Sequence, residues 1–266
     1  VNESDGNSGR TRYSKQILSE VEKVATSAGV SIKSMSRYGI NVASGIIHTQ
    51  KEQEATQLII GLHRKANIID SFLGWLTETL LSEINREVLV VKMLMPFNTI
   101  RRIVVAVPPK AEYEAGFTKW IGHLAKMSSA LGCRIYFHAT AETMAYIERV
   151  VYTLPLKDKA KFNLMESWDD FMMLSAAVNY DHLLVVVSAR RGSISYNKSL
   201  DNLPAQLSKY FANNSLILLY PDQFGEHTAL QAFADPMSGH ISPVSWTSYF
   251  KHNYLVALRW LRTRFK

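Results

Sequence analysis

A short segment rich in donors for anions, Ser188–Ser195, follows directly on the apolar run HLLVVV. Guanidinium groups bind phosphate or carboxylate through paired N–H donors, and serine hydroxyls and main-chain N–H groups add further donors. In an open α/β sheet, the loop after a buried strand is the usual place for a ligand. We therefore interpret this segment as a candidate anion site. Its candidate ligand-binding residues are Ser188, Arg190, Arg191, Gly192, Ser193 and Ser195.

A second segment of this kind follows the apolar run QLIIGL in the first hundred residues. Its candidate ligand-binding residues are Gly61, His63, Arg64 and Gly74. Two roles are open for both clusters. Their cationic side chains bind a nucleotide or another small anion, or they pair with acidic groups across a domain or dimer interface.

The sequence lacks the motifs of the common cofactor and metal sites. It contains no Walker A segment, no GxGxxG, no HExxH and no CxxC pair, and its eight histidines show no metal-ligand spacing. The pair Asp169–Asp170 opens an expected helix, where carboxylates complement the helix dipole. No set of nucleophile, base and orienting group is evident. We predict no enzymatic activity, no metal and no resident cofactor, with a nucleotide as the alternative ligand.

The composition is that of a globular protein with a substantial core, since hydrophobic residues make up 47% of the 266 residues. The net charge of +7 allows an anionic small molecule as a partner. The aromatic and basic strand face of an RNA-binding sheet is missing, so we predict no nucleic-acid partner. Apolar runs reach core-strand length only, short of a membrane span. The single cysteine, Cys133, fits a reducing compartment and is expected to be a buried structural thiol.

The elements that would position these loops alternate regularly from Arg101 onward. The expected strands are RRIVVAV, RIYFHA, AKFNLM, HLLVVV and SLILLY. The expected helices lie at Tyr113–Leu131, Glu142–Leu154, Trp168–Asn179 and Leu203–Phe211. Near-continuous apolar strands that alternate with helices predict a parallel sheet covered on both faces.

The first hundred residues repeat the second half of this pattern. Gly61 corresponds to Ser188 at an offset of 127 residues, and Leu89 corresponds to Ile217 at an offset of 128. An offset that holds across several elements predicts a tandem duplication. The strand at Arg102, projected back by this offset, falls before Val1. The first repeat is therefore expected to lack its opening strand and helix, and the chain is expected to be a fragment of a longer protein.

Four segments are predicted along the chain. They are a partial α/β domain at 1–98, a complete α/β domain at 99–224, a turn-rich linker at 225–244 and a basic amphipathic C-terminal helix at 245–266. Ser245 is a suitable N-cap for this helix, which carries apolar residues on one face and basic residues on the rest. The helix either docks on the protein or lies at an interface with anionic lipid or a partner.

The doubly wound repeat with a candidate loop at this place resembles the universal stress protein domain. Nucleotide-binding members of that family carry Gly-x2-Gly-x9-Gly-Ser/Thr, whose main-chain amides wrap the phosphates. Arg64 and Trp75 stand where the first loop should have a glycine and a hydroxyl, and Arg191 and Asp201 replace two of the glycines in the second. These departures argue against ATP binding in the manner of the family. The expected fold class is α/β, with tandem doubly wound parallel-sheet domains of this type, the first lacking its opening strand and helix, plus a C-terminal helix.

Longer segments carry a narrower resemblance that runs through loops as well as strands. They are SRYGINVASGIIHTQKEQEATQLIIGLHRKANIIDSFLG, NTIRRIVVAVPPKAEYEAGF, YDHLLVVVSARRGSISY and LPAQLSKYFANNSLILLYPDQFG. Over roughly Ser34–Gly225 the chain resembles the cytoplasmic C-terminal, tandem universal-stress-like region of bacterial sodium/proton antiporters. The antiporters concerned are those of the second monovalent cation/proton antiporter family, notably from Bacteroidetes.

The resemblance implies a cytosolic regulatory domain at the cytoplasmic face of the inner membrane. Its partner would be the membrane transport domain of the same polypeptide, and we also expect a homodimer. The domain would modulate transport by sensing a ligand or an ionic or pH signal and by subunit packing. The residues that exchange cation for proton would lie outside this sequence, so no catalytic residue is carried over. The alternative is a stand-alone universal stress protein that binds ATP or another nucleotide.

Overall fold

The structure is a computed structural model that describes residues 2–3, 8–39, 41–61, 75–156 and 158–224. The predicted linker at 225–244, the predicted C-terminal helix at 245–266 and the candidate residues His63, Arg64 and Gly74 lie outside the described residues.

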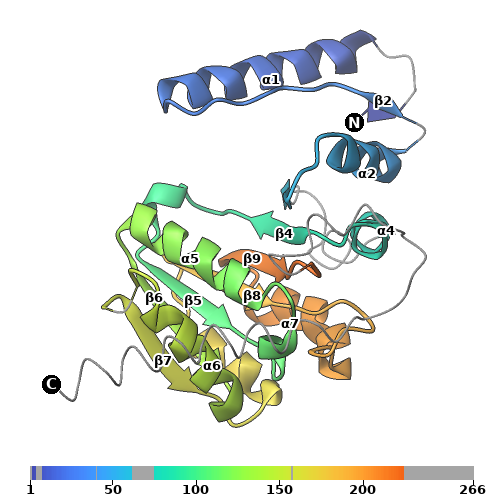
Figure 1. Cartoon of the computed structure of the whole chain (residues 1–266). Coiled ribbons are helices and arrows are strands. Elements are labelled where there is room, and N and C mark those ends of the chain that lie inside the picture. Colours follow the sequence, from blue (N-terminus) through green and yellow to red (C-terminus); the bar gives the residue numbers. More distant parts are fainter. Residues whose placement is uncertain (1, 4–7, 40, 62–74, 157, 225–266) are drawn as a thin grey trace, which may run out of the picture. The chain divides into compact units, whose positions relative to one another are not determined.

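Seven strands form one sheet in the order β3-β4-β9-β8-β5-β6-β7 (Figure 1). The strands are β3 (Gln57–Gly61), β4 (Glu87–Lys92), β5 (Arg102–Ala106), β6 (Arg134–Ala139), β7 (Ala160–Leu164), β8 (His182–Val187) and β9 (Ser215–Tyr220). Neighbouring strands run parallel, except that β4 and β9 run antiparallel. Two short strands, β1 (Asn2–Glu3) and β2 (Tyr38–Gly39), form a separate parallel pair.

Helices connect these strands, as Figure 1 shows. The α-helices are α1 (Ser8–Ser27), α2 (Val42–Glu52), α4 (Trp75–Glu83), α5 (Phe117–Leu131), α6 (Ala141–Tyr152) and α7 (Leu203–Tyr210). The 3-10 helices are η1 (Phe97–Thr99), η2 (Ala111–Tyr113), η3 (Trp168–Ala176) and η4 (Lys198–Asn202). Among the helices that the structure describes, none is both long and apolar enough to cross a membrane.

The central strands of the sheet are buried on both faces, and their successive side chains point into two different apolar clusters. Val105 of β5 belongs to an apolar cluster that includes residues of α5 and α6. Its neighbour Val104 belongs to a second cluster, which includes residues of α4, η3 and α7. All six residues of β8 and all six of β9 are buried. The layers are therefore helix, sheet and helix, and the predicted α/β fold class is confirmed.

The strands of the two predicted domains are hydrogen-bonded into one sheet through β4 and β9. On one side of this join, β9-β8-β5-β6-β7 has the doubly wound order, in which the chain moves outward in both directions from β5. The other side holds the pair β3-β4. The predicted duplication and the predicted domain boundaries stay predictions.

Several elements agree closely with the sequence patterns, and the helix predicted at Trp168–Asn179 differs. It is a 3-10 helix that ends at Ala176. Its buried residues, Trp168, Phe171 and Leu174, recur every three positions, which suits the three residues per turn of a 3-10 helix. The rings of Trp168 and Phe171 stack at 5.4 Å. Asp170 accepts from the Ser167 N–H in a capping box, as expected for a carboxylate at a helix start.

Cys133 is buried, as predicted, at the end of α5. Burial raises the pKa of its thiol, so the reactive thiolate is disfavoured. α5 itself begins at Phe117, later than the pattern indicated, because the preceding turn is the separate 3-10 helix η2.

Candidate functional site

The candidate anion loop begins at the carboxyl end of β8, where the sequence predicted it. Ser188 continues the line of the strand, because its N–H donates to the Leu219 carbonyl at 2.8 Å. The chain then turns at Gly192, whose φ of +89° lies in the left-handed region that glycine adopts at low cost. The loop thus carries two neighbouring arginines, Arg190 and Arg191, immediately before a sharp turn.

Arg190 points into the protein, and only 8% of its surface is exposed. Its Nη1 donates to the Pro221 carbonyl, while its Nη2 donates to the carbonyls of Ile84 at 3.1 Å and Arg86 at 2.7 Å. Burial lowers the pKa of the guanidinium, and the charge of Asp222 acts in the opposite direction. Because these carbonyls flank the amino end of β4 and the carboxyl end of β9, Arg190 ties the two sides of the antiparallel join together.

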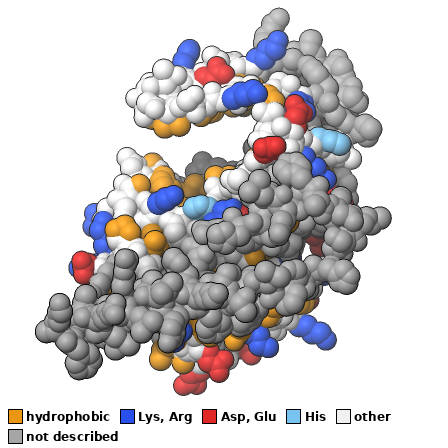
Figure 2. All heavy atoms as spheres, in the orientation of Figure 1, with side chains coloured by type: hydrophobic (Ala, Val, Ile, Leu, Met, Phe, Trp, Pro, Cys, Tyr) orange, Lys and Arg blue, Asp and Glu red, His pale blue; other side chains and the backbone are white. Residues whose placement is uncertain are grey.

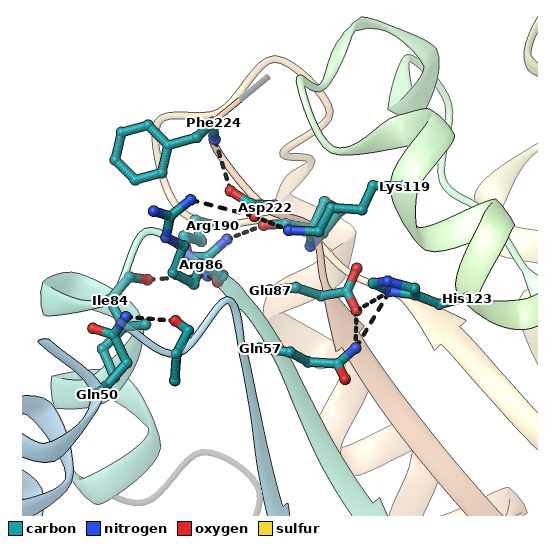
Figure 3. A network of polar contacts seen from close by, with 12 residues as sticks. Gln50, Gln57, Ile84, Arg86, Glu87, Lys119, His123, Arg190, Asp222 and Phe224 are labelled. Atoms are coloured by element: carbon teal, nitrogen blue, oxygen red, sulfur yellow. Dashed lines mark hydrogen bonds and ion pairs between the residues drawn. The ribbon is translucent and has the colours of Figure 1, made fainter. Parts of the chain in front are cut away.

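Asp222 is a buried carboxylate at the same place, with 1% of its side chain exposed. Its Oδ2 contacts the ammonium of Lys119 on α5 and lies 4.0 Å from Nη1 of Arg86 (Figure 3). Its Oδ1 accepts from the Phe224 N–H at 2.8 Å. Such a carboxylate needs these partners, because an unpaired buried charge is strongly destabilising.

A second buried carboxylate, Glu87, opens β4 and has no exposed surface. Its Oε1 lies 2.8 Å from Nδ1 of His123 on α5 and accepts from Gln57 at the start of β3 (Figure 3). Its Oε2 is buried and has no hydrogen-bond partner in the part of the chain that the structure describes. We call the set around both carboxylates the junction network: Gln57, Arg86, Glu87, Lys119, His123, Arg190 and Asp222.

Arg191 points the other way, with 79% of its side chain exposed. Its Nη2 lies 3.6 Å from Oδ1 of Asp201, which is itself 45% exposed. The Tyr196 hydroxyl donates to the same carboxylate, at 2.8 Å to one oxygen and 2.9 Å to the other. Two adjacent arginines with the same predicted role thus have opposite environments.

Ser193 and Ser195 of the loop donate to acceptors of the protein itself. The N–H and the hydroxyl of Ser195 both donate to Oε1 of Glu114, at 2.9 and 2.7 Å. The Ser193 hydroxyl donates to the Arg190 carbonyl at 2.8 Å. Burial raises the pKa of the Tyr220 phenol to about 12, and the neighbouring Ser188 acts in the opposite direction. The donors of Ser193 and Ser195 and both terminal nitrogens of Arg190 are therefore engaged with acceptors of the chain, whereas Arg191 is exposed and Nε of Arg190 is buried without a partner among the described residues.

Gly61, the described residue of the first predicted cluster, does not lie beside the loop after β8. Gly61 ends β3, which is parallel to β4 and therefore antiparallel to β8. Along the strand direction, the carboxyl ends of β3 and β8 consequently lie at opposite ends of the sheet. Whether Gly61 or the loop after β8 binds a ligand stays a prediction.

Sequence reasoning missed the acidic residues of this region, namely Glu87, Glu114 and Asp222. A weak signal existed for two of them, since Glu87 opens the apolar run EVLVV and Asp222 follows the strand SLILLY after a proline. Glu114 gave no signal, because it lies 81 residues from its partner Ser195. His123 gave no signal either, because it lies between apolar residues of α5.

The described residues provide no metal centre. On the face that Figure 2 shows, their charged side chains form no large patch of a single sign of charge. No group of three or more His, Cys, Asp or Glu within the described ranges could hold a metal ion. Basic and acidic side chains are interspersed on this face, with apolar patches between them (Figure 2).

Comparisons with known proteins identify the fold. No family model and no curated protein matches the chain. A universal stress protein from Archaeoglobus fulgidus is similar in structure, with a TM-score of 0.55 and 12% identity over 84% of each chain. A protein from Pseudomonas aeruginosa that is assigned to the universal stress proteins has a TM-score of 0.53 and 16% identity over 78% of each chain. The fold is that of the universal stress proteins.

The chain is also similar in structure to part of a transport protein. The cytoplasmic domain of a prokaryotic cation chloride cotransporter has a TM-score of 0.50 and 13% identity over 86% of each chain. At these identities the likeness concerns the fold, and the chemistry of this chain must be argued from its own contacts.

Proposed function

We propose that the chain is a cytosolic regulatory domain of a sodium/proton antiporter and has no enzymatic activity of its own. Three observations support this proposal: the sequence resemblance over roughly Ser34–Gly225, the universal-stress-like fold, and the likeness to a cytoplasmic domain of a transporter. The proposed partner is the membrane transport domain of the same polypeptide, at the cytoplasmic face of the inner membrane, and the proposed assembly is a homodimer.

The observation that carries the proposal is the state of the loop after β8. Arg190 and Ser195 of this loop bind carbonyls and a carboxylate of the chain, so this part of the phosphate-loop position serves internal packing. A domain of this kind would regulate transport by changing how its strands and helices pack. A ligand or ion can act as the signal only if it binds one packing arrangement more tightly than the other. The junction network is suited to this role, because Asp222 and Glu87 link β4, β9 and α5 through buried polar contacts.

The first test is the reading frame that encodes the chain. The proposal expects apolar segments of about 20 residues, each long enough to span a membrane, in the same frame before Val1. A reading frame that starts within the segment encoding this chain would contradict the proposal.

The second test measures sodium-dependent proton transport in vesicles that contain the full-length product. Lys119→Met removes the ammonium that contacts Asp222, and we expect it to change the transport rate severalfold at an equal amount of protein in the membrane. Lys126→Met, on an exposed position of the same helix, is the matched control and should leave the rate unchanged. Transport that is unaffected by Lys119→Met and by deletion of residues 99–224 contradicts a regulatory role.

The alternative is a stand-alone universal stress protein that binds a nucleotide, and the fold shared with such proteins favours it. A ligand that binds only the folded state raises its stability in proportion to the logarithm of ligand concentration. A thermal shift of several degrees with millimolar ATP would therefore support this alternative. We expect no shift.

A further inference from the structure

The seven-stranded sheet is symmetric in its connectivity about the antiparallel join of β4 and β9. Val90 of β4 pairs with Leu218 of β9, and each of these two strands has a parallel neighbour on its outer side. Ile60 of β3 pairs with Val90, as Val186 of β8 pairs with Leu218. β3 therefore holds the place on one side of the join that β8 holds on the other.

The two strands differ at their outer edges. β8 is bonded there to β5, a parallel strand whose five residues Arg102–Ala106 pair with His182–Val186. β3 pairs with β4, and the described residues provide no strand on its other edge. None of the main-chain hydrogen bonds described for other turns and loops of the molecule involves residues 57–61.

Exposure of the side chains follows the same difference. Ile59 is 64% exposed, whereas Val185, which has the corresponding place in β8, is fully buried at 0%. The strand QLIIG contains no charged residue and no proline. Natural edge strands are usually protected by lysine, proline, a bulge or a covering element, because unpaired N–H and C=O groups are a template for another strand.

We propose that the outer edge of β3, which no strand of the described residues occupies, takes up one further strand that runs parallel to β3 and is rich in β-branched residues, as β5 is. The partner is an extended polypeptide segment other than a second copy of β3. Main-chain hydrogen bonds would supply affinity, and the apolar contact with Ile59 would favour Val or Ile in the added strand. The chemistry is that of β5, whose sequence RIVVA fills the corresponding edge of β8.

A second copy of the chain is the competing occupant. Two β3 strands could pair antiparallel around Ile59, but each has only five residues. The parallel arrangement is also the one that this sheet already uses at the corresponding edge of β8.

The test uses the whole chain and a fluorescent peptide with the sequence of Thr99–Lys110, TIRRIVVAVPPK, which contains β5. We expect saturable binding in fluorescence anisotropy and slower amide hydrogen exchange at residues 57–61 when the peptide is present. Ile59→Lys should weaken binding at least tenfold. Ile194→Lys is the matched control, since Ile194 is 62% exposed and lies in the loop after β8, and it should bind the peptide as the unmodified chain does.

Three results would overturn the proposal. Equal binding by the two variants would place the peptide elsewhere, and absence of binding by the unmodified monomer would show that the edge accepts no strand. A dimer in light scattering that Ile59→Lys dissociates and Ile194→Lys does not would assign the edge to a second copy. Should Ile59→Lys fail to fold, exchange at residues 57–61 of the unmodified chain still decides the question, because a strand at this edge must slow it.

Discussion

The neighbouring residues Arg190 and Arg191 allow a sharp test of how the loop after β8 is used. Both were predicted anion donors, but Arg190 is 8% exposed and bonded to three carbonyls, while the side chain of Arg191 is 79% exposed. The perturbation is Arg190→Met, compared with Arg191→Met. Methionine keeps much of the length and volume of the arginine stem, so the change removes the charge and the donors and leaves little cavity.

The magnitude for Arg190→Met follows from the contacts that it removes. Each buried carbonyl that loses its donor costs about 1–3 kcal/mol, and these costs overlap because the three carbonyls share one donor group. The charge of Asp222 also favours the guanidinium, although the ion-pair contacts of this carboxylate are to Lys119 and Arg86. Hydrogen bonds to a charged donor contribute about 1.5–3 kcal/mol each. We therefore expect a loss of about 3–5 kcal/mol. Arg191→Met should cost less than about 0.5 kcal/mol, since exposed ion pairs contribute little.

The assay is urea unfolding followed by tryptophan fluorescence. With a slope of about 3 kcal/mol per molar urea, the expected loss lowers the midpoint of Arg190→Met by about 1 M or more. Arg191→Met should leave the midpoint within about 0.2 M of the unmodified chain. Arg190→Lys, which keeps the charge but lacks the planar fork of donors, should fall between them. Equal midpoints for the two methionine variants would refute the view that Arg190 holds the join together.

Three further predictions concern packing, pH and the donors of the loop. Gly116→Ala should lower the stability in urea unfolding by about 1–3 kcal/mol, because the new Cβ would lie 2.6 Å from main-chain atoms of Asp222. Gly122→Ala, within α5 and with open space around its Cβ, should not lower the stability. The pKa of the His182 imidazole is lowered by burial and by a nearby guanidinium, so the unfolded state binds more protons and stability should fall as the pH drops from 7 to 5. His182→Asn should flatten that dependence, and an unchanged slope would contradict the assignment. Glu114→Ala should lower the stability by about 2 kcal/mol. The melting temperature of this variant should depend on the concentration of inorganic phosphate, whereas that of the unmodified chain should not. Equal phosphate sensitivity of both proteins would count against this role of the carboxylate.

The acid sensitivity expected at His182 has a local geometric cause. The Asn179 N–H donates to its Nδ1 at 3.1 Å, so this nitrogen must be an acceptor and the ring neutral. A proton on Nδ1 would oppose this donor inside a site that is 4% exposed. The folded state therefore resists protonation, which is the direction of the lowered pKa.

Much of the fold could be predicted from local patterns. The strands at 134–139, 182–187 and 215–220 agree with the predicted runs, because each is a short apolar segment between turn residues. That η3 is a 3-10 helix rather than an α-helix could not be predicted in this way. A period of three and a period of 3.6 differ little over nine residues, and the stacking of Trp168 on Phe171 depends on the fold.

The contacts of the candidate site depend on sequence separations that no local pattern reports. Arg190 reaches the carbonyls of Ile84 and Arg86 across 106 and 104 residues. Main-chain acceptors of this kind have no sequence signature, since every residue carries a carbonyl. The sequence could therefore identify an arginine cluster at the right place but could not assign its partners.

The antiparallel join explains why these partners had to come from far apart in the chain. Because β4 and β9 run in opposite directions, the carboxyl end of β9 lies beside the amino end of β4. The loop after β8 emerges at the same edge, since β8 and β9 are parallel. Arg190 therefore meets main-chain carbonyls from both sides of the join, and Asp222 meets a lysine of α5 and an arginine that precedes β4. If the chain is regulatory as proposed, a signal that shifts the two sides of the join relative to each other must break these buried contacts, so the junction network is the place to test for regulation.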